Sequence, residues 1–110
     1  AMIELNGETF NSDAMPSGRK TISYYKRVPI GVASLITPFN FPLNLIAHKL
    51  APALIAGNAV VLKPTPEAPR VAYEFAKLFI DSKHRSPNAL SLIYGDADVG
   101  GEIVKNPISR

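Results

Sequence analysis

Apolar runs and longer mixed segments alternate along most of this chain. The apolar runs lie at residues 31–36, 59–62 and 90–94, and none of them alternates strictly with polar positions. Such runs are typical of parallel strands that helices cover on both faces. The pattern therefore predicts an α/β fold in which a parallel β-α-β-α-β sheet occupies residues 29–110.

The first predicted helix spans residues 43–56 and is apolar nearly all round, so we expect it to be largely buried. Gly57 follows the segment and is predicted to end the helix. Pro52 lies inside the segment and cannot donate a backbone hydrogen bond, which predicts a kink or a break near Leu50.

Two further helices are predicted in the second half of the chain. Residues 69–82 are amphipathic and are expected to form a surface helix. Another helix is expected to start near Asp98, whose carboxylate would cap exposed backbone amides, and to run toward Asn106.

The first 28 residues have a different pattern. Short alternating runs are separated by turn-like segments at residues 11–13 and 16–18, which predicts antiparallel strands. Neither face of the second run is uniformly apolar, and two strands alone are only marginally stable in water. We therefore expect residues 1–28 to form a β-ribbon that packs on another domain or another subunit.

Charge and hydropathy exclude two classes of partner. The net charge is +3, and the 12 basic residues form no dense stripe with interleaved aromatic side chains, so nucleic-acid binding is not expected. The longest apolar stretch, residues 43–61, is interrupted by polar residues and proline, so no membrane span is expected. No signal peptide is visible, which predicts a soluble, cytoplasmic protein.

Metal and thiol chemistry are also limited by the sequence. His48 and His84 are isolated from each other and from carboxylate clusters, so we expect no metal site. The chain contains no cysteine, which excludes disulfides and a cysteine nucleophile within these 110 residues.

The most distinctive motif is TPFNFP at residues 37–42. Its central Asn40 lies between two aromatic residues and is bracketed by prolines, a rigid way to aim a side-chain amide that can stabilise an oxyanion. The alternative is an Asx turn. Lys63 ends the second apolar run, where open α/β sheets bind ligands, although an isolated lysine at a strand end is usually only solvated.

These motifs resemble a known family. TPFNFP at residues 37–42, APAL at 51–54, GN at 57–58 and VLKP at 61–64 are similar in order and spacing to the first half of the cofactor domain of NAD(P)-dependent aldehyde dehydrogenases. The resemblance covers nearly the whole chain and implies a partial Rossmann-like domain. It also implies NAD or NADP as cofactor, an aldehyde as substrate of the full-length enzyme, and a homo-oligomer in which the ribbon joins an oligomerisation sheet.

The resemblance assigns roles to the residues around the motif. Asn40 would be catalytic, because its side-chain amide shares the family's oxyanion hole with the backbone amide of the catalytic cysteine. Phe39 stands where tryptophan is commoner. The residues that line the nicotinamide-ribose and pyrophosphate side of the cofactor cleft would be Ile36, Thr37, Pro38, Phe39 and Asn40.

The resemblance places the adenosine ribose at Lys63 and Thr65. The family often has a glutamate three residues after this lysine, but Pro66 stands there and Glu67 follows one position later. Loss of that carboxylate removes one element that favours NAD over NADP, so use of NADP or of both cofactors is expected. Entry of Glu67 into the site stays open as an alternative.

Gly95 and Gly100 match family positions that pass close to the adenine, where the lack of a Cβ atom permits approach. Both glycines fit turn and cap positions equally well, and that alternative stays open.

The chain lacks two catalytic residues of the resembled family, which limits its expected activity. By the resemblance, the nucleophilic cysteine and the general-base glutamate of the family lie outside these residues, so we expect a fragment that does not turn over alone. Two alternatives remain, a stand-alone nucleotide-binding or assembly module and a piece of a related acylating or reductive enzyme. The motif at Asn40 argues against the second of these.

Overall fold

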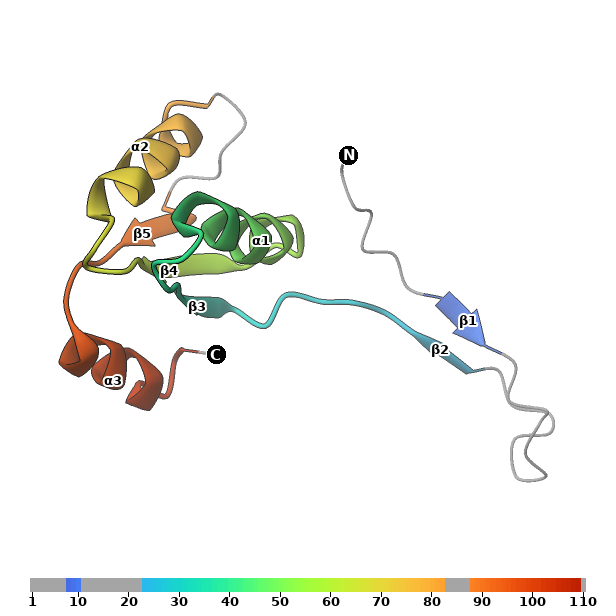
Figure 1. Ribbon diagram of the computed structural model, residues 1–110. Helices are drawn as coiled ribbons and strands as arrows, with labels where there is room; N and C mark the ends of the chain where they lie inside the picture. Colours follow the sequence, from blue (N-terminus) through green and yellow to red (C-terminus); the bar gives the residue numbers. More distant parts are fainter. Residues whose placement is uncertain (1–7, 11–22, 83–87, 110) are drawn as a thin grey trace.

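The computed structural model describes residues 8–10, 23–82 and 88–109, which form a β-ribbon and an α/β unit (Figure 1). The elements follow in the order β1 (Glu8–Phe10), β2 (Ser23–Tyr25), β3 (Val32–Ile36), α1 (Pro42–Ile55), β4 (Ala59–Lys63), α2 (Pro69–Ile80), β5 (Leu90–Leu92) and α3 (Ala97–Lys105). From β3 onward strands and helices alternate, which confirms the predicted order.

The strands β3, β4 and β5 form a sheet in that order, and both pairings are parallel. Val32 pairs with Ala59, and Val60 pairs with Leu90. Because the strands are parallel and nearly in step, their carboxyl ends meet at one edge of the sheet. The predicted parallel α/β sheet is confirmed.

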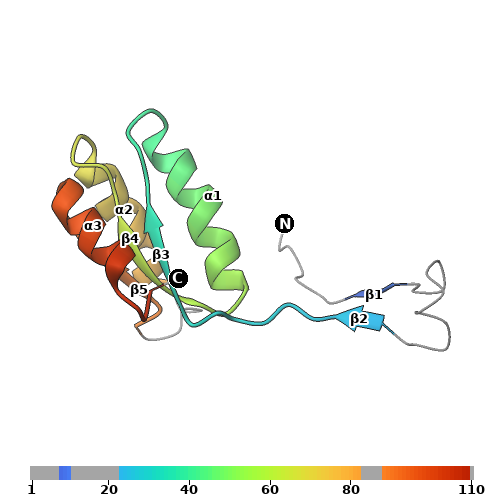
Figure 2. The same ribbon diagram turned by 90° about the horizontal axis from the view of Figure 1, so that it is seen from below.

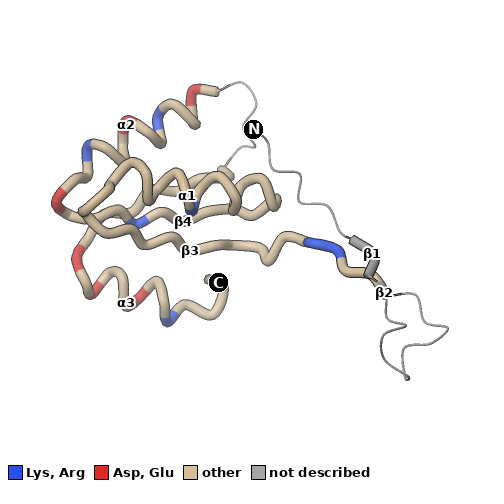
Figure 3. The backbone as a smooth tube through the Cα atoms, turned by 45° about the vertical axis from the view of Figure 1, so that its right-hand side comes forward, with Lys and Arg blue, Asp and Glu red and all other residues tan. Residues whose placement is uncertain are grey.

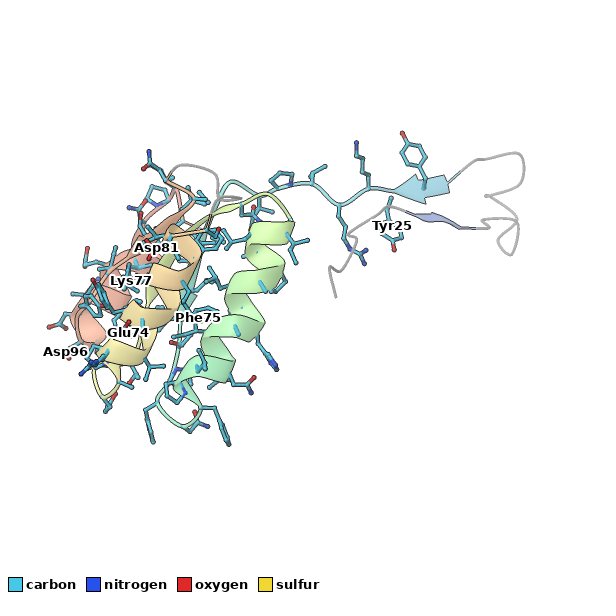
Figure 4. The ribbon with its side chains drawn as sticks, turned by 90° about the horizontal axis from the view of Figure 1, so that it is seen from above. Tyr25, Glu74, Phe75, Lys77, Asp81 and Asp96 are labelled. Carbon is cyan, nitrogen blue, oxygen red and sulfur yellow. The ribbon has the colours of Figure 1, made fainter. Side chains whose placement is uncertain are left out.

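Helices cover both faces of this sheet (Figure 1). α1 and α2 lie together on one face, and Phe75 of α2 points toward α1 (Figure 4). The buried cluster on this face consists of Ile46, Leu50, Val60, Leu62 and Ala72. α3 lies against β3 on the other face, where the backbone of Gly100 approaches the side chain of Ile36.

The first helix is less buried than predicted. Only Ile46 and Leu50 of α1 are fully buried, whereas Leu43 is 51% and Ile55 is 42% exposed. The prediction of a largely buried helix is therefore wrong. An apolar surface is buried only where a partner covers it, and among the described residues α1 meets the sheet and α2 on one side only.

The predicted break in α1 is also wrong, because the helix runs without interruption past Pro52. Proline removes the hydrogen bond to the carbonyl of His48, four residues earlier. His48 and Pro52 are both exposed, so the carbonyl freed by the proline lies on the solvent side, where water replaces the lost bond. Gly57, at φ +85°, then ends the helical turn as predicted.

Asn58 ties the start of β3 to the end of α1. Its Oδ1 accepts hydrogen bonds from the backbone amides of Ile30 at 2.7 Å and Gly31 at 3.2 Å, and its Nδ2 donates to the carbonyl of Ala53 at 3.0 Å. Asn58 is only 9% exposed, so these bonds satisfy polar groups that water reaches poorly. The side chain thereby holds β3 and β4 in register at their amino ends.

The second and third helices agree with their predicted positions within a few residues. α2 buries Ala72 and Ala76 and exposes the ion pair between Arg70 and Glu74, as expected of an amphipathic surface helix. α3 starts one residue before Asp98, whose side chain makes no capping bond. Its negative charge instead lies in the first turn, where the helix dipole favours it.

The β-ribbon extends away from the α/β unit (Figure 2). β1 and β2 are antiparallel, with Thr9 opposite Tyr24, which confirms the predicted pairing for these residues. The predicted turns at residues 11–13 and 16–18 lie outside the described residues. Tyr24 is 72% exposed, and the guanidinium of Arg27 lies 5.4 Å from the ring centre of Tyr25.

Basic side chains of the described residues are spread over the ribbon, all three helices and β4 (Figure 3). No described helix is long and apolar enough to cross a membrane.

Candidate functional site

The order of strands reverses at β3. Its edge away from β4 is met by Ser109, which forms a parallel bridge with Val32. The chain thus moves from β3 to β5 in one direction, crosses back over the opposite face through α3, and returns beside β3 (Figure 2). Open α/β sheets bind ligands outside the carboxyl ends of the strands at such a switch point. The carboxyl ends of β3 and β4 are therefore the place to look for a site.

Thr37 follows β3 at this edge of the sheet. Its backbone amide donates to the carbonyl of Lys63 at 3.2 Å, which extends the pairing of β3 and β4 by one bond. Thr37 is 3% exposed, and its Oγ1 is a buried side-chain oxygen without a hydrogen-bond partner. A buried hydroxyl without a partner is costly, which marks it as a group available to a ligand.

Asn40 lies in the exposed loop between β3 and α1. Among the described residues its side-chain amide makes no hydrogen bond, so the Asx-turn alternative has no bond to support it. Phe39 is 65% and Phe41 is 62% exposed on either side of it. Pro42 starts α1 directly afterwards, so the amide lies just before a helix amino end. The catalytic role of Asn40 stays a prediction.

Lys63 ends β4 on the face covered by α3. The residue is 5% exposed, and its stem lies against Gly100, where an added Cβ would be 3.6 Å from Lys63 Cε and 3.8 Å from Ile36 Cδ1. Within the described part of the chain the ammonium has no hydrogen bond or ion pair. A cation at the carboxyl end of a strand that has no partner among the described residues suits a hydroxyl-rich or anionic ligand.

The segment after Lys63 turns sharply toward α2. Thr65 is 4% exposed, and its hydroxyl donates to Oε2 of Glu67. Pro66 and Glu67 are exposed. The carboxylate of Glu67 is thus held beside Thr65, one of the two residues predicted to hold the adenosine ribose.

Gly95 follows β5 at φ +153°, and an added Cβ would lie 2.4 Å from Cγ2 of Val99. Packing alone therefore requires glycine here, which favours the structural alternative over an adenine contact. Tyr94 precedes it and is 48% exposed, and partial desolvation raises the pKa of its phenol above the ordinary value, with a smaller contribution from Tyr73. The adenine role of Gly95 is not needed to explain the residue.

The structure brings some of the predicted residues together and leaves others apart. Ile36, Lys63 and Gly100 meet between β3, β4 and α3, and Thr37 is bonded to the backbone of Lys63. Among the described residues no hydrogen bond joins Asn40 to this group.

Lys49 of α1 was missed by the sequence analysis, although its Nζ donates to the Ile36 carbonyl at 2.6 Å. The Thr37 hydroxyl was missed as well, because only the backbone of that residue was expected to matter. An isolated lysine on an otherwise apolar helix was the signal that pointed to Lys49.

One hollow lies away from the ends of β3 and β4. A hollow of about 470 Å³ lies between α2 and β5, and its charged lining residues are Lys77 and Asp81 (Figure 4). It is mostly apolar and shares none of the residues at the ends of β3 and β4. No group of three potential metal ligands occurs in the described residues, whereas His84 lies outside them.

An open, doubly wound α/β unit with polar groups at its switch point is the architecture in which many nucleotide-binding domains, those for dinucleotides among them, hold their ligand. The model of the aldehyde dehydrogenase family matches residues 1–110, so the chain belongs to that family. This confirms the resemblance found from the motifs.

Relatives of known name support this assignment. A lactaldehyde dehydrogenase from Methanococcus maripaludis is 42% identical over 107 residues, which are 97% of this chain and 22% of the relative. The structure of glyceraldehyde-3-phosphate dehydrogenase GapN from Methanocaldococcus jannaschii, complexed with NADP, has a TM-score of 0.81 at 39% identity and covers 97% of this chain and 23% of its own. A Mycobacterium tuberculosis aldehyde dehydrogenase complexed with NAD+ has a TM-score of 0.79 at 34% identity and covers 94% of this chain and 20% of its own. The chain thus spans about a fifth of the length of the relatives it matches.

Proposed function

We propose that this chain is the first part of the cofactor domain of an NAD(P)-dependent aldehyde dehydrogenase. The complete enzyme would convert an aldehyde, water and oxidised cofactor into a carboxylic acid, a proton and reduced cofactor. In this division, residues 1–28 are an oligomerisation ribbon and residues 29–110 belong to the cofactor domain. The exposed tyrosines of the ribbon support its assembly with a further subunit into a homo-oligomer.

The observation that carries this proposal is Lys63. Its side chain is buried at the carboxyl end of β4, and its ammonium is unpaired among the described residues. Ribose hydroxyls or a 2′-phosphate would supply the hydrogen-bond acceptors that the protein does not. The unpartnered hydroxyl of Thr37 on the neighbouring strand fits the same polar ligand.

We propose that the site accepts NADP as well as NAD. Pro66 stands where the family often carries a carboxylate, so one source of repulsion toward a 2′-phosphate is absent. The side chain of Glu67 accepts a hydrogen bond from the Thr65 hydroxyl, which holds it beside the proposed ribose position. GapN, complexed with NADP, and the mycobacterial enzyme, complexed with NAD+, are both similar to this chain.

The cofactor supplies hydride acceptance when bound, and the residues of this chain bind and orient. The side-chain amide N–H of Asn40 would donate a hydrogen bond to the oxyanion that forms when a thiolate adds to the aldehyde. The thiolate must come from outside these residues because the chain has no cysteine. We therefore propose that the chain alone binds cofactor without turning over aldehyde. The cytoplasmic location expected from the sequence stays a prediction.

A fluorescence titration of the purified chain with NADPH and NADH tests the proposal. The chain lacks tryptophan, so the emission of the reduced cofactor is read against a quiet background. Lys63→Ala should weaken binding by about tenfold or more, the worth of hydrogen bonds to a charged group. Lys77→Ala removes an exposed lysine from α2 and should leave binding unchanged.

Saturable binding that depends on Lys63 would support a working half-site. Saturable binding that is unaffected by Lys63→Ala would refute the placement of the ribose. Lys63-dependent binding without aldehyde turnover at saturating cofactor is expected both of a fragment of the enzyme and of a stand-alone nucleotide-binding module.

A further inference from the structure

The Ile36 carbonyl is the last backbone acceptor on the open edge of β3. Carbonyls and amides alternate in direction along a strand, and Gly31 and Thr37 both bond to β4. Val32 lies an odd number of residues from both Gly31 and Thr37, so its backbone groups face the opposite edge, where it pairs with Ser109. Ile36 belongs to the same set as Val32, so its carbonyl points away from β4 on the open edge of β3.

Lys49 satisfies this carbonyl from a different element. Its ammonium reaches from α1 around the edge of β3 and donates to Ile36 O at 2.6 Å. Hydrogen bonds with a charged donor are shorter and stronger than neutral ones, and this one, at 2.6 Å, is slightly shorter than the usual range of about 2.7–2.9 Å.

The loop of residues 37–41 is held at its two ends. At one end Thr37 bonds to β4, and at the other the amide of Leu45 donates to the carbonyl of Phe41 at 2.9 Å. Within the described chain, Pro38, Phe39 and Asn40 make no hydrogen bond of their own. The orientation of the Ile36–Thr37 peptide therefore sets the direction in which the loop leaves the sheet.

We propose that Lys49 is a positioning residue, whose ammonium locks the Ile36–Thr37 peptide and thereby aims the loop that carries Asn40 toward the switch point. This inference deepens the proposed function and rests on it for the purpose of the loop, although the lock itself is a property of the chain. A tie that only joined α1 to the sheet would contribute to stability and leave the loop unchanged.

Nuclear magnetic resonance of the labelled chain tests the lock without any cofactor. In the unaltered chain, we expect a coupling through the hydrogen bond between Lys49 15Nζ and Ile36 13C′. In Lys49→Met, the resonances of Ile36 13C′, the Thr37 amide and the Asn40 side-chain amide should move, and Lys49→Arg should restore most of the change. Lys77→Met is the matched control and should move none of them.

The cofactor titration gives the second readout. Lys49→Met should weaken NADPH binding by about tenfold, and Lys49→Arg should return it to within about twofold of the unaltered chain. If neither the unaltered chain nor any variant binds NADPH, the proposed function fails in this chain. The resonance data still show whether Lys49 holds the Ile36–Thr37 peptide in place.

Loop resonances that stay in place in a folded Lys49→Met, or absence of the coupling in the unaltered chain, would overturn the inference. The coupling is measured without a substitution, so it remains decisive if Lys49→Met does not fold.

Discussion

Replacing Gly95 with alanine should strongly destabilise the α/β unit. The added Cβ would lie 2.4 Å from Cγ2 and 2.7 Å from Cβ of Val99, both inside van der Waals contact. The neighbour cannot swing away, because Cβ of Val99 is fixed to the backbone of the first turn of α3. The backbone at φ +153° is also one that side chains other than glycine rarely adopt.

These two effects give the expected magnitude. A residue held in a sparsely populated backbone conformation costs about 1–3 kcal/mol, and overpacking adds about 1–3 kcal/mol. Gly95→Ala should therefore lower the free energy of unfolding by about 2–6 kcal/mol. A domain of this size has only about 5–15 kcal/mol in total, so the variant is expected to be partly unfolded at 37 °C.

Urea unfolding followed by circular dichroism measures the effect, and a double-mutant cycle assigns it. Val99→Ala removes both Cγ atoms but keeps the Cβ at 2.7 Å, so it should recover only part of the overpacking cost of about 1–3 kcal/mol in Gly95→Ala, and the backbone strain remains. A Gly95→Ala variant as stable as the unaltered chain, with weakened NADPH binding, would refute this reasoning. That result would mean that glycine is required for the approach of the cofactor and not for packing.

Three further outcomes are expected. Asn58→Ala should lower the free energy of unfolding by about 2–4 kcal/mol in urea, because two backbone amides lose their acceptor, whereas Asn58→Asp keeps the acceptor and should lose less. Glu74→Ala should change it by no more than about 0.5 kcal/mol, since its partner Arg70 is 90% exposed at the side chain. The raised pKa of Tyr94 favours the neutral phenol in the folded state, so its contribution to stability is complete below pH 10.0 and is lost as pH rises through the folded pKa. A pH series of urea unfolding should therefore show a smaller loss above that pH in Tyr94→Phe, and an equal loss would contradict the assignment.

The strands and helices of the α/β unit were predictable because each is a local pattern. The runs at residues 31–36 and 59–62 lack alternation, which parallel strands covered on both faces produce, and both are strands in the structure. The burial of α1 was not predictable in the same way. The apolar residues of a helix show how much surface it is able to bury. How much of that surface is exposed depends on which other elements pack against the helix.

The candidate site was predictable only in part. Asn40 and Lys63 were identified from their motifs, and only the resemblance assigned Lys63 and Gly100 to the adenosine half of the cofactor; their contact with each other was not predicted. The bond from Lys49 to Ile36 joins residues from two elements through a long side chain, and no spacing rule encodes such a reach. The unpartnered hydroxyl of Thr37 likewise becomes visible only when burial is known.

The most direct test of the account is to map the cofactor onto the chain by the amide resonances that NADPH shifts. The account predicts that the shifted amides cluster at the carboxyl ends of β3 and β4, at residues 36–40 and 63–67, and at Gly100. Shifts confined to the hollow between α2 and β5, or no shifts at saturating NADPH, would contradict it.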